Sequence, residues 1–405
     1  MKVEAIIKSA QERLKPLIEA IDETALFNQE KVLSAFKEER IAVRHFLQSN
    51  GYGYGDEGRE ALGRVFARAF GAEQAIVSPA LLSGTHTINV ALFGILRPND
   101  RALIITGTPY DTIQGVLWGE GNGSFKDFQI AFDVVQLKDG KVDFPAVKDA
   151  LQKHAYKLVY IQRSRGYELR DSFTVDEIET MCSFVRSCGF EGRIFCDNCY
   201  GEFAEKKEPT EVGCDYMAGS LIKNPGGGLA PTGGYIAGKE EVLRLVEGRL
   251  TAPSVGAEVG SYAYGYRLYY QGLFLAPHVV AQILKGGLLI GACLESLGYV
   301  TYPQADKVPA DITRAVRFDT AKQLTDFIMS VQECSPVDSF VRPEAWDMPG
   351  YESQVIMAAG TFVGGATSEL SADAPIREPY VAYFQGGLTY EHCKIACKRI
   401  LEKLI

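Results

Sequence analysis

Two segments of the chain combine residue types that together support carbanion chemistry. Lys223 stands within residues 217–228, which read MAGSLIKNPGGG, after small residues and before a glycine run. Upstream, Asp197 ends the apolar stretch RIFCD. A lysine amine forms a Schiff base with a carbonyl, and a nearby carboxylate keeps a pyridine nitrogen protonated, so that the ring accepts electrons. These are the two protein groups that pyridoxal 5'-phosphate (PLP) needs most.

The chemistry of Lys223 depends on its protonation state. A free lysine amine titrates near ~10.4, so it is a poor nucleophile and base at neutral pH. A partly buried site beside other positive charge is expected to lower the pKa of Lys223. The following glycines are expected to let the backbone approach the cofactor closely. The alternative interpretation is a solvated loop lysine.

A phosphate site is predicted where Ser83, Gly84 and Thr85 follow a strand and open a helix. Backbone N–H groups at a helix N-terminus, together with two hydroxyls, bind phosphate well. Ser220, three residues before Lys223, is expected to reach the same phosphate. The alternative for Ser83 and Thr85 is a simple helix cap, since Ser and Thr are common there.

Tyr110 lies just past the end of another predicted strand, in the segment TPYDT. Strand C-termini in open α/β sheets point toward the ligand crevice, so an aromatic ring there is placed to stack on a planar cofactor. Ordinary packing of one tyrosine among 20 is the alternative. For Asp197 the alternative is a turn or helix cap.

Three arginines are candidates for binding a substrate carboxylate. Arg163 and Arg165 follow a predicted strand in QRSRGY, and Arg377 lies in APIREPY near the C-terminus. A planar guanidinium binds a carboxylate through two parallel hydrogen bonds. Each of them has a surface arginine as the alternative interpretation.

Composition excludes several classes of function. The chain has 405 residues, of which 46% are hydrophobic and 23% charged, and its net charge of −9 favours neither nucleic acid nor an anionic membrane. No apolar run of the ~18–20 residues needed to span a membrane was recognised, and charged residues interrupt the first twenty positions, so a cytoplasmic protein is expected. Nine cysteines without zinc-site spacing indicate free thiols and no metal.

Short apolar strands alternate with helical patterns and predict an α/β fold. The alternation favours a mostly parallel sheet covered by helices on both faces. Strands are predicted at 75–78, 102–106, 134–137, 158–162, 194–196, 216–218 and, antiparallel, 235–237, and helices at 59–70, 85–96, 144–154 and 175–188. Two amphipathic helices are predicted within 1–50, and a long helix at 278–297 is followed by strand-like pieces at 312–318 and 355–359 and a final helix at 390–404.

Three units are expected from this pattern. Residues 1–50 form an N-terminal helical arm, 51–277 a large PLP-binding domain, and 278–405 a smaller C-terminal α+β domain.

In their order along the chain, these motifs resemble those of the fold-type I PLP enzymes, in particular the Cys/Met metabolism group. The resemblance is to the cystathionine β-lyase-like or methionine γ-lyase-like branch, also called aluminium-resistance proteins. It rests on GYGYGDEG at 51–58, QRSRGY at 162–167 and IKNPGGG at 222–228, and it covers essentially the whole chain.

The resemblance implies roles for the candidate residues. Lys223 would carry PLP covalently and shuttle protons, Asp197 would bind the pyridinium nitrogen, and Tyr110 would stack on the ring and act as a second catalytic residue by assisting proton transfer. It also implies a homotetramer built from dimers that share active sites. Better-known members place Tyr-x-Arg in the N-terminal loop, whereas this chain has Tyr52-Gly-Tyr54. The expected contact to the partner's phosphate is therefore made by these tyrosines, with an arginine from elsewhere in the chain as the alternative.

The implied activity is elimination of a thiol from a sulfur amino acid. Two alternatives remain open: another fold-type I reaction, such as aldol cleavage or aminotransfer, and a PLP-binding protein without turnover.

Overall fold

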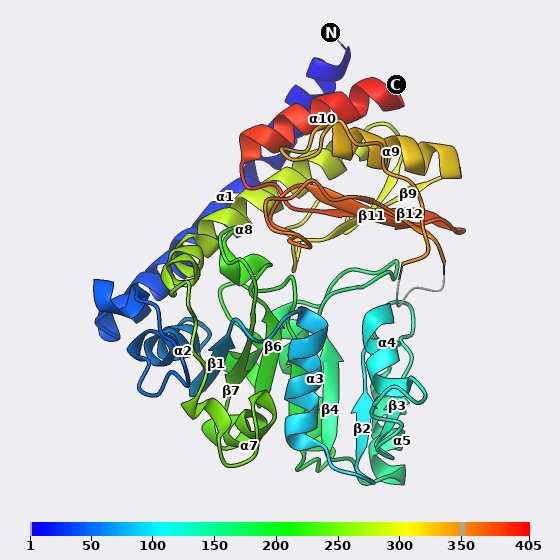
Figure 1. Cartoon of the computed structure of the whole chain (residues 1–405). Coiled ribbons are helices and arrows are strands. Elements are labelled where there is room, and N and C mark those ends of the chain that lie inside the picture. The colour runs from blue at the N-terminus through cyan, green and yellow to red at the C-terminus, as the bar shows by residue number, and fades with distance from the viewer. Residues whose placement is uncertain (1, 349–352) are drawn as a thin grey trace.

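The computed structural model describes residues 2–348 and 353–405, which form two sheets with helices packed around them (Figure 1). The larger sheet has the strand order β1-β7-β6-β5-β4-β2-β3, and the smaller one the order β10-β11-β12-β9-β8. The expected α/β architecture with a second, smaller α+β part is therefore confirmed.

The seven-stranded sheet is parallel except for one strand. It comprises β1 (Gln74–Ser78), β2 (Arg101–Ile104), β3 (Ala131–Val134), β4 (Leu158–Gln162), β5 (Arg193–Asp197), β6 (Tyr216–Ser220) and β7 (Gly234–Gly238). β7 pairs antiparallel with both β1 and β6, as predicted. The other pairs are parallel, so these strands end at one edge of the sheet.

Alternate residues of each strand bury against different helices. One face packs on α3 (Gly84–Ile95), α4 (Asp111–Trp118) and α7 (Glu240–Leu250). The other packs on α2 (Glu57–Ala69), α5 (Phe144–Lys153) and α6 (Val175–Ser187). Within β5, Phe195 faces the first layer while Ile194 and Cys196 face the second. Burial on both faces explains why these strands read as continuous apolar runs.

The five-stranded sheet is antiparallel throughout. Its strands are β8 (Val300–Tyr302), β9 (Arg314–Phe318), β10 (Val355–Ala358), β11 (Ser371–Pro375) and β12 (Tyr380–Gln385). Helix α9 (Ala321–Glu333) lies between β9 and β10 in the chain, and α10 (Tyr390–Leu404) follows β12. In Figure 1 this sheet lies above the edge at which the parallel strands end.

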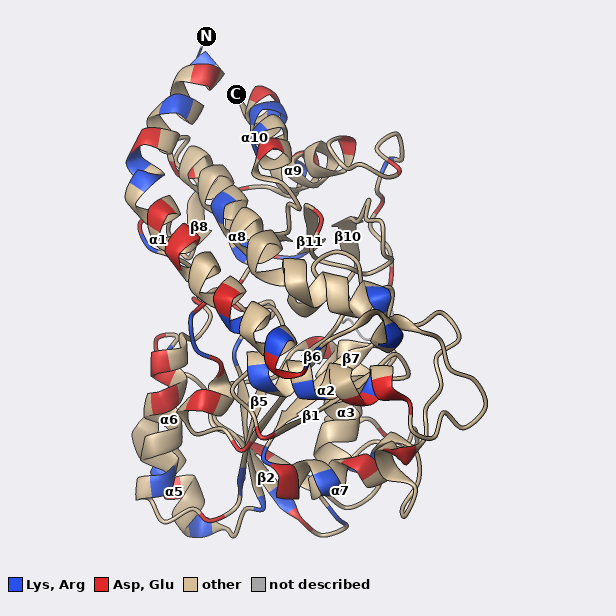
Figure 2. Cartoon of the chain, turned by 90° about the vertical axis from the view of Figure 1, so that its left-hand side faces the viewer, with Lys and Arg blue, Asp and Glu red and all other residues tan. Residues whose placement is uncertain are grey.

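The longest apolar helix is α8 (Arg267–Glu295), and it runs beside α1 (Lys2–Glu38) in both views (Figures 1 and 2). By length and composition alone α8 could cross a membrane, but 67% of its most apolar window is buried inside the protein. Figure 2 shows α1 with charges of both signs, whereas α8 is mostly uncharged. α8 is therefore a core helix shielded by α1.

Several predicted boundaries differ from the structure. The helix predicted at 278–297 begins at Arg267, so it crosses residue 277, where the domain boundary was expected. The two helices predicted within 1–50 are one continuous helix, α1, followed by the short 3₁₀ turn η1 (Val43–Phe46). The strand predicted at 134–137 occupies residues 131–134, and α4, α7 and α9 were not predicted. The division into domains remains a prediction.

Candidate active site

A cavity of about 140 Å³ lies where the two sheets meet. From the parallel sheet and its loops it is lined by Gly84, Thr85, Tyr110, Asp197 and Lys223, and from the small sheet and the loop before it by Thr313, Asp373, Tyr383 and Gln385. The strand ends bring residues from distant parts of the chain together, as the crevice of an open α/β sheet requires. Five of the residues singled out in the sequence therefore line one cavity.

Lys223 is half-buried and directly follows the turn after β6. Its Nζ lies 3.7 Å from the centre of the Tyr200 ring. The next residue, Asn224, is fully buried and donates from Nδ2 to the carbonyls of Tyr200 and Glu202, each at 2.9 Å. Tyr200 has a φ of 74°, a left-handed conformation that is costly for an aromatic residue. Asn224 thus fixes the tyrosine loop against the lysine.

The environment of Lys223 differs from the one expected. Burial disfavours its ammonium, but Cys199, Tyr200 and Asp197 around it outweigh that effect and raise the pKa of Lys223 above the ordinary lysine value. No Lys or Arg lines the cavity beside it among the described residues. The predicted depression by neighbouring positive charge is therefore wrong for the protein by itself.

Asp197 is the last residue of β5 and is almost completely buried. Its Oδ1 accepts from the backbone N–H of Cys199 at 3.1 Å, and its Oδ2 accepts from the hydroxyl of Tyr160 at 3.4 Å. Burial raises the pKa of Asp197, against the opposing effects of these donors and of Lys223. A cationic ring nitrogen placed here would favour the ionised carboxylate.

The residues predicted to bind phosphate surround the N-terminus of α3. A Cβ on Gly84 would lie 3.6 Å from the Cβ of Ser220, so these two positions adjoin. The hydroxyl of Ser220 is buried without a hydrogen-bond partner, and that of Thr85 bonds to Thr112 at 3.0 Å. Ser83 is exposed, and its Oγ accepts from the backbone N–H of His86 at 3.1 Å. Its side chain caps the helix and does not line the cavity.

The glycines after Lys223 allow close packing within the protein, whereas close approach to the cofactor was expected. A Cβ on Gly226 would lie 1.8 Å from the carbonyl oxygen of Leu221, and one on Gly227 would lie 2.3 Å from that of Gly272 in α8. Neither glycine lines the cavity. The close backbone approach is therefore to the turn itself and to the core helix, not to a ligand.

Tyr110 is half-buried at the start of α4 and faces the cavity. Its backbone N–H donates to Oε1 of Gln162 at 2.8 Å, which ties it to the end of β4. Its ring lies 5.5 Å from that of Tyr167, edge to face at 68°. A Cβ on Gly166 would lie 3.3 Å from the Tyr110 ring, so the loop after β4 packs directly on it.

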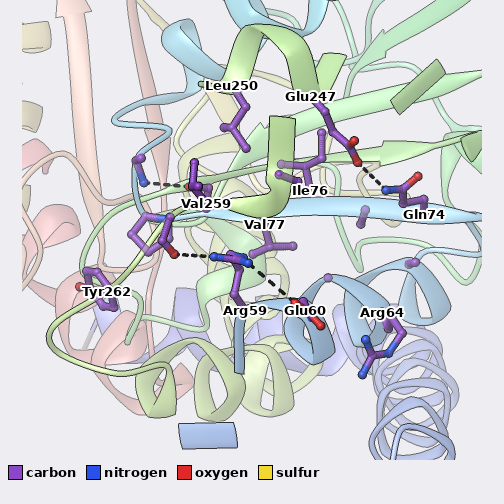
Figure 3. Close-up of a pocket in the computed structure, with 18 of the residues that line it drawn as sticks. Arg59, Glu60, Arg64, Gln74, Ile76, Val77, Glu247, Leu250, Val259 and Tyr262 are labelled. Carbon is purple, nitrogen blue, oxygen red and sulfur yellow. Dashed lines mark hydrogen bonds and ion pairs between the residues drawn. The ribbon is translucent and has the colours of Figure 1, made fainter. Parts of the chain in front are cut away.

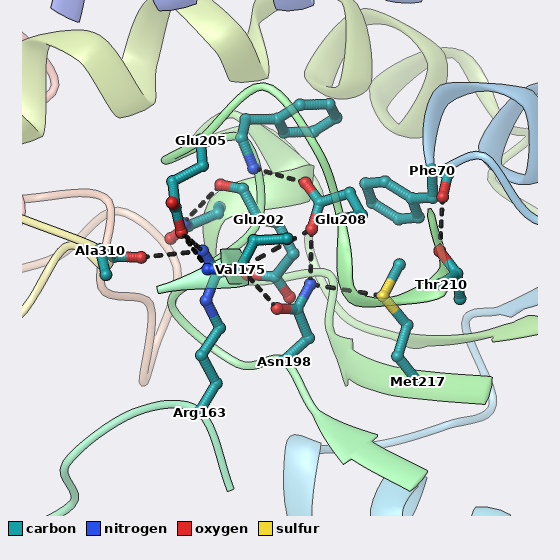
Figure 4. A network of polar contacts seen from close by, with 12 residues as sticks. Phe70, Arg163, Val175, Asn198, Glu202, Glu205, Glu208, Thr210, Met217 and Ala310 are labelled. Carbon is teal, nitrogen blue, oxygen red and sulfur yellow. Dashed lines mark hydrogen bonds and ion pairs between the residues drawn. The ribbon is translucent and has the colours of Figure 1, made fainter. Parts of the chain in front are cut away.

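Arg163 is not brought to the cavity. Its side chain is fully buried and bonds to Oδ1 of Asn198 at 2.8 Å, to Oε2 of Glu205 at 2.6 Å and to the carbonyl of Ala310 at 3.0 Å (Figure 4). Its Nε donates to the carbonyl of Phe173 at 3.3 Å. Because protein acceptors occupy this guanidinium, it does not fit the predicted role of binding a substrate carboxylate.

The other two arginines also lie outside the cavity lining. Arg165 is buried, donates to the carbonyls of Tyr302 at 2.5 Å and Thr313 at 3.2 Å, and forms an ion pair with Asp311 at 3.6 Å. It joins the loop after β4 to the segment before β9. Arg377 is exposed in the turn between β11 and β12.

Tyr52 and Tyr54 stand on the outer surface, 71% and 69% exposed, with their rings 5.5 Å apart. Arg59 holds their loop by donating from Nη1 to the carbonyls of Gly53 and Gly260, both at 2.9 Å. Two adjacent tyrosines on a fastened loop are an unusual exposed aromatic surface, but they do not line the cavity of their own chain.

A larger cavity of about 480 Å³ lies beside this loop, between α2, β1 and residues 257–262 (Figure 3). Arg59, Gln74, Glu247 and Tyr262 are among its lining residues. It contains none of the candidate residues, so we assign the chemistry to the smaller cavity.

Several cavity residues were not recognised in the sequence: Gln162, Tyr167, Tyr200, Asp373 and Gln385. Gln162 and Tyr167 belong to the QRSRGY segment, whose two arginines are the stronger signal for binding an anion. Tyr200 follows Asp197 closely and could have been found from that position. Asp373 and Gln385 lie on strands that were not predicted, and no local signal marked them.

Comparisons with known proteins identify a family and several similar structures. The profile of the methionine gamma-lyase family matches residues 3–405. The uncharacterised YnbB protein of Bacillus subtilis is 47% identical, over 100% of this chain and 95% of its own length. The solved structure of a carbon-sulfur lyase involved in aluminium resistance from Clostridium novyi is 44% identical, with a TM-score of 0.96 over 100% of this chain and 96% of that one.

Other solved structures extend the comparison. A Listeria monocytogenes protein, provisionally named a cystathionine beta-lyase involved in aluminium resistance, is 50% identical, with a TM-score of 0.96 over 99% of this chain and all of that one. Cystathionine gamma synthase from Xanthomonas oryzae is 14% identical with a TM-score of 0.61, over 94% of this chain and 98% of that one, which shows a shared fold. The fold is that of the fold-type I PLP enzymes, and the chain belongs to the methionine gamma-lyase family.

Proposed function

We propose that the cavity binds PLP, held covalently by Lys223, and that the protein is a carbon–sulfur lyase acting on a sulfur amino acid. The observation that carries the proposal is the unpartnered buried hydroxyl of Ser220, which adjoins Gly84 at the N-terminus of α3, while Gly84 itself lines the cavity together with Lys223 and Asp197. A buried hydroxyl without a hydrogen-bond partner is unfavourable unless a ligand supplies that partner. A helix N-terminus favours an anionic ligand.

The donor set fits each part of PLP. The N–H groups at Gly84 and Thr85 and the hydroxyl of Ser220 would hold the phosphate, Asp197 the ring nitrogen, and Tyr110 a face of the ring. When bound, PLP supplies an electron sink for the carbanion formed at the substrate's Cα.

The chain's own residues then have defined tasks. With PLP bound, Lys223 would take the proton from the substrate's Cα and return it later, as a positioned general base and acid does. Tyr200, in contact with Nζ, orients the lysine. Asp197 keeps the ring nitrogen protonated. The net reaction consumes one water and releases a thiol, ammonia and a 2-oxo acid.

Membership of the methionine gamma-lyase family and the similarity to the Clostridium novyi carbon-sulfur lyase support elimination over the alternatives. Aldol cleavage or aminotransfer on the same fold, and PLP binding without turnover, are the competing readings. We also propose a cytoplasmic location, which the acidic composition and free cysteines support.

The activity is tested by incubating the PLP-loaded protein separately with L-cystathionine, L-cysteine and L-methionine. We expect thiol or sulfide and 2-oxo acid in equal amounts from at least one of them. A 2-oxo acid that retains its sulfur, with no thiol released, would indicate aminotransfer. No product from any of the three, and no exchange of the Cα proton in deuterated water, would indicate binding without turnover.

We further propose a homotetramer built from dimers, in which Tyr52 and Tyr54 contact the phosphate site of a neighbouring subunit. The support is their high exposure on a loop that Arg59 fastens. Exposed tyrosines of this kind are typical of protein interfaces. Sedimentation equilibrium of the PLP-loaded protein is expected to give four chains, and a monomer at micromolar concentration would contradict the proposal.

A further inference from the structure

The charges that line the cavity are unbalanced. Asp197 and Asp373 are its two carboxylates, and Lys223 is its one Lys or Arg among the described residues. Asp197 and Lys223 already have roles toward the proposed cofactor. Asp373 feels the charge of Lys223 across the cavity but forms no ion pair with any Lys or Arg among the described residues, and no arginine candidate lines the cavity. A partly buried carboxylate without an ion-pair partner is stabilised when a ligand brings a cation to it.

Asp373 is held in place by neutral donors. The hydroxyl of Tyr167 donates a short hydrogen bond to its Oδ2. The ring of Tyr167 packs against that of Tyr383 at 4.8 Å, and the hydroxyl of Tyr383 donates to the carbonyl of Tyr167 at 2.5 Å. Gln385 lies close enough to lower the pKa of Asp373, and its Nε2 donates to Oγ of Ser371 at 3.1 Å. The carboxylate is therefore oriented by its neighbours.

These donors leave the acid able to accept more. A carboxylate has about four lone-pair positions, and the hydroxyl of Tyr167 uses one of them. Asp373 is only half-buried, and its side chain lines the cavity. Burial raises the pKa of Asp373, and Lys223 partly opposes that rise. A further cation in the cavity would lower the pKa of Asp373 and favour the ionised carboxylate. The site is thus prepared to receive a positively charged group.

Asp373 also lies on a different part of the fold from the reacting lysine. Lys223 follows β6 of the parallel sheet, whereas Asp373 lies in β11 of the small sheet, across the cavity lining. A substrate held in the cavity would therefore meet Lys223 from the parallel sheet and Asp373 from the small sheet.

We infer that Asp373 binds a positively charged group at the far end of the substrate, and that the protein prefers sulfur amino acids that carry a second ammonium. The inference rests on the proposed elimination and narrows its substrate class. Cystathionine has such an ammonium beyond its sulfur, whereas methionine ends in a neutral methyl group. Asp373 is then a specificity-determining residue.

Two substrates of matched shape test this directly. S-(2-aminoethyl)-L-cysteine and S-propyl-L-cysteine differ in a terminal ammonium against a methyl group. Elimination from the first, with one water, gives 2-aminoethanethiol, pyruvate and ammonia, and the second gives propanethiol with the same pyruvate and ammonia. We expect kcat/KM of the PLP-loaded protein to favour the aminoethyl substrate by roughly 10- to 100-fold, the range of a hydrogen bond to a charged group.

Asp373→Asn keeps the shape and the acceptor for Tyr167 but removes the charge. We expect it to abolish the preference by lowering kcat/KM for the aminoethyl substrate and not for the propyl one. Glu378→Gln is the matched control, because it removes one negative charge from the exposed turn that follows β11. It should keep the full preference. Equal turnover of both substrates by the natural protein, or a preference that survives in Asp373→Asn, would overturn the inference.

Calorimetric binding to the PLP-loaded protein separates the inference from the proposed activity. If neither compound is consumed, the proposed elimination fails for both, but the aminoethyl compound should still bind at least tenfold more tightly than the propyl one. That difference should vanish in Asp373→Asn. Equal affinities in the natural protein would overturn the role of Asp373 whatever the reaction.

Discussion

Lys223→Ala is expected to lower kcat for elimination by about 10³-fold or more, because it removes the group that both holds the cofactor and moves the Cα proton. The change leaves Tyr200 and Asn224 in place, and Asn224 makes its hydrogen bonds to the tyrosine loop without the lysine. Kinetics of thiol release, measured beside circular dichroism of the same sample, separates loss of catalysis from loss of folding.

Two further experiments distinguish a loss of catalysis from a loss of folding. A small primary amine added to Lys223→Ala should restore part of the rate by entering the vacated space as a base, which a merely unfolded variant would not show. Lys322→Ala on the surface of α9, where the side chain is 84% exposed, should keep the natural rate. A Lys223→Ala protein that retains more than a tenth of the natural rate would contradict the assigned role.

Asp197→Asn is expected to lower kcat by about 10²- to 10³-fold, the usual effect of removing one strong electrostatic contact from an active site. A neutral amide cannot keep the ring nitrogen protonated. Asp197→Glu retains the charge and should recover part of the lost rate. Steady-state kinetics of both variants with saturating PLP gives the comparison.

The same substitution has an opposite expected effect on the protein without its cofactor. Burial raises the pKa of Asp197, so the ionised carboxylate disfavours folding at neutral pH, and its contribution worsens as pH rises above the ordinary aspartate pKa. Asp197→Asn without PLP should therefore be at least as stable to urea at pH 7 as the natural protein. A large loss of stability would mean that Asp197 serves the fold and not the cofactor.

The fold was predictable in segments whose local sequence pattern determines the secondary structure. β4 and α10 were predicted with correct bounds, because one is a continuous apolar run and the other is strongly amphipathic with a threonine cap. β11, which reads SADAP, was missed because small and polar residues have weak strand preference. Only pairing with β10 and β12 makes it a strand.

The candidate site divides in the same way. Lys223, Asp197 and Gly84 follow strand ends or open a helix, so local patterns place them at one edge of the sheet. Arg163 misled the prediction because its acceptors lie far along the chain, including the carbonyl of Ala310, 147 residues away. Hydrogen-bond acceptors that lie so far along the chain from an arginine cannot be predicted from the residues next to it in the sequence. The role inferred for Asp373 depends on the same kind of long-range contact.

The central claim, that Lys223 holds PLP covalently, is tested most directly by reducing the PLP-loaded protein with sodium borohydride and mapping its peptides by mass spectrometry. Reduction fixes any carbon–nitrogen linkage between the cofactor and a lysine. We expect a single reduced phosphopyridoxyl group, on the peptide that contains Lys223. A modified peptide from another lysine, or no modified peptide from protein that carries PLP, would contradict the account.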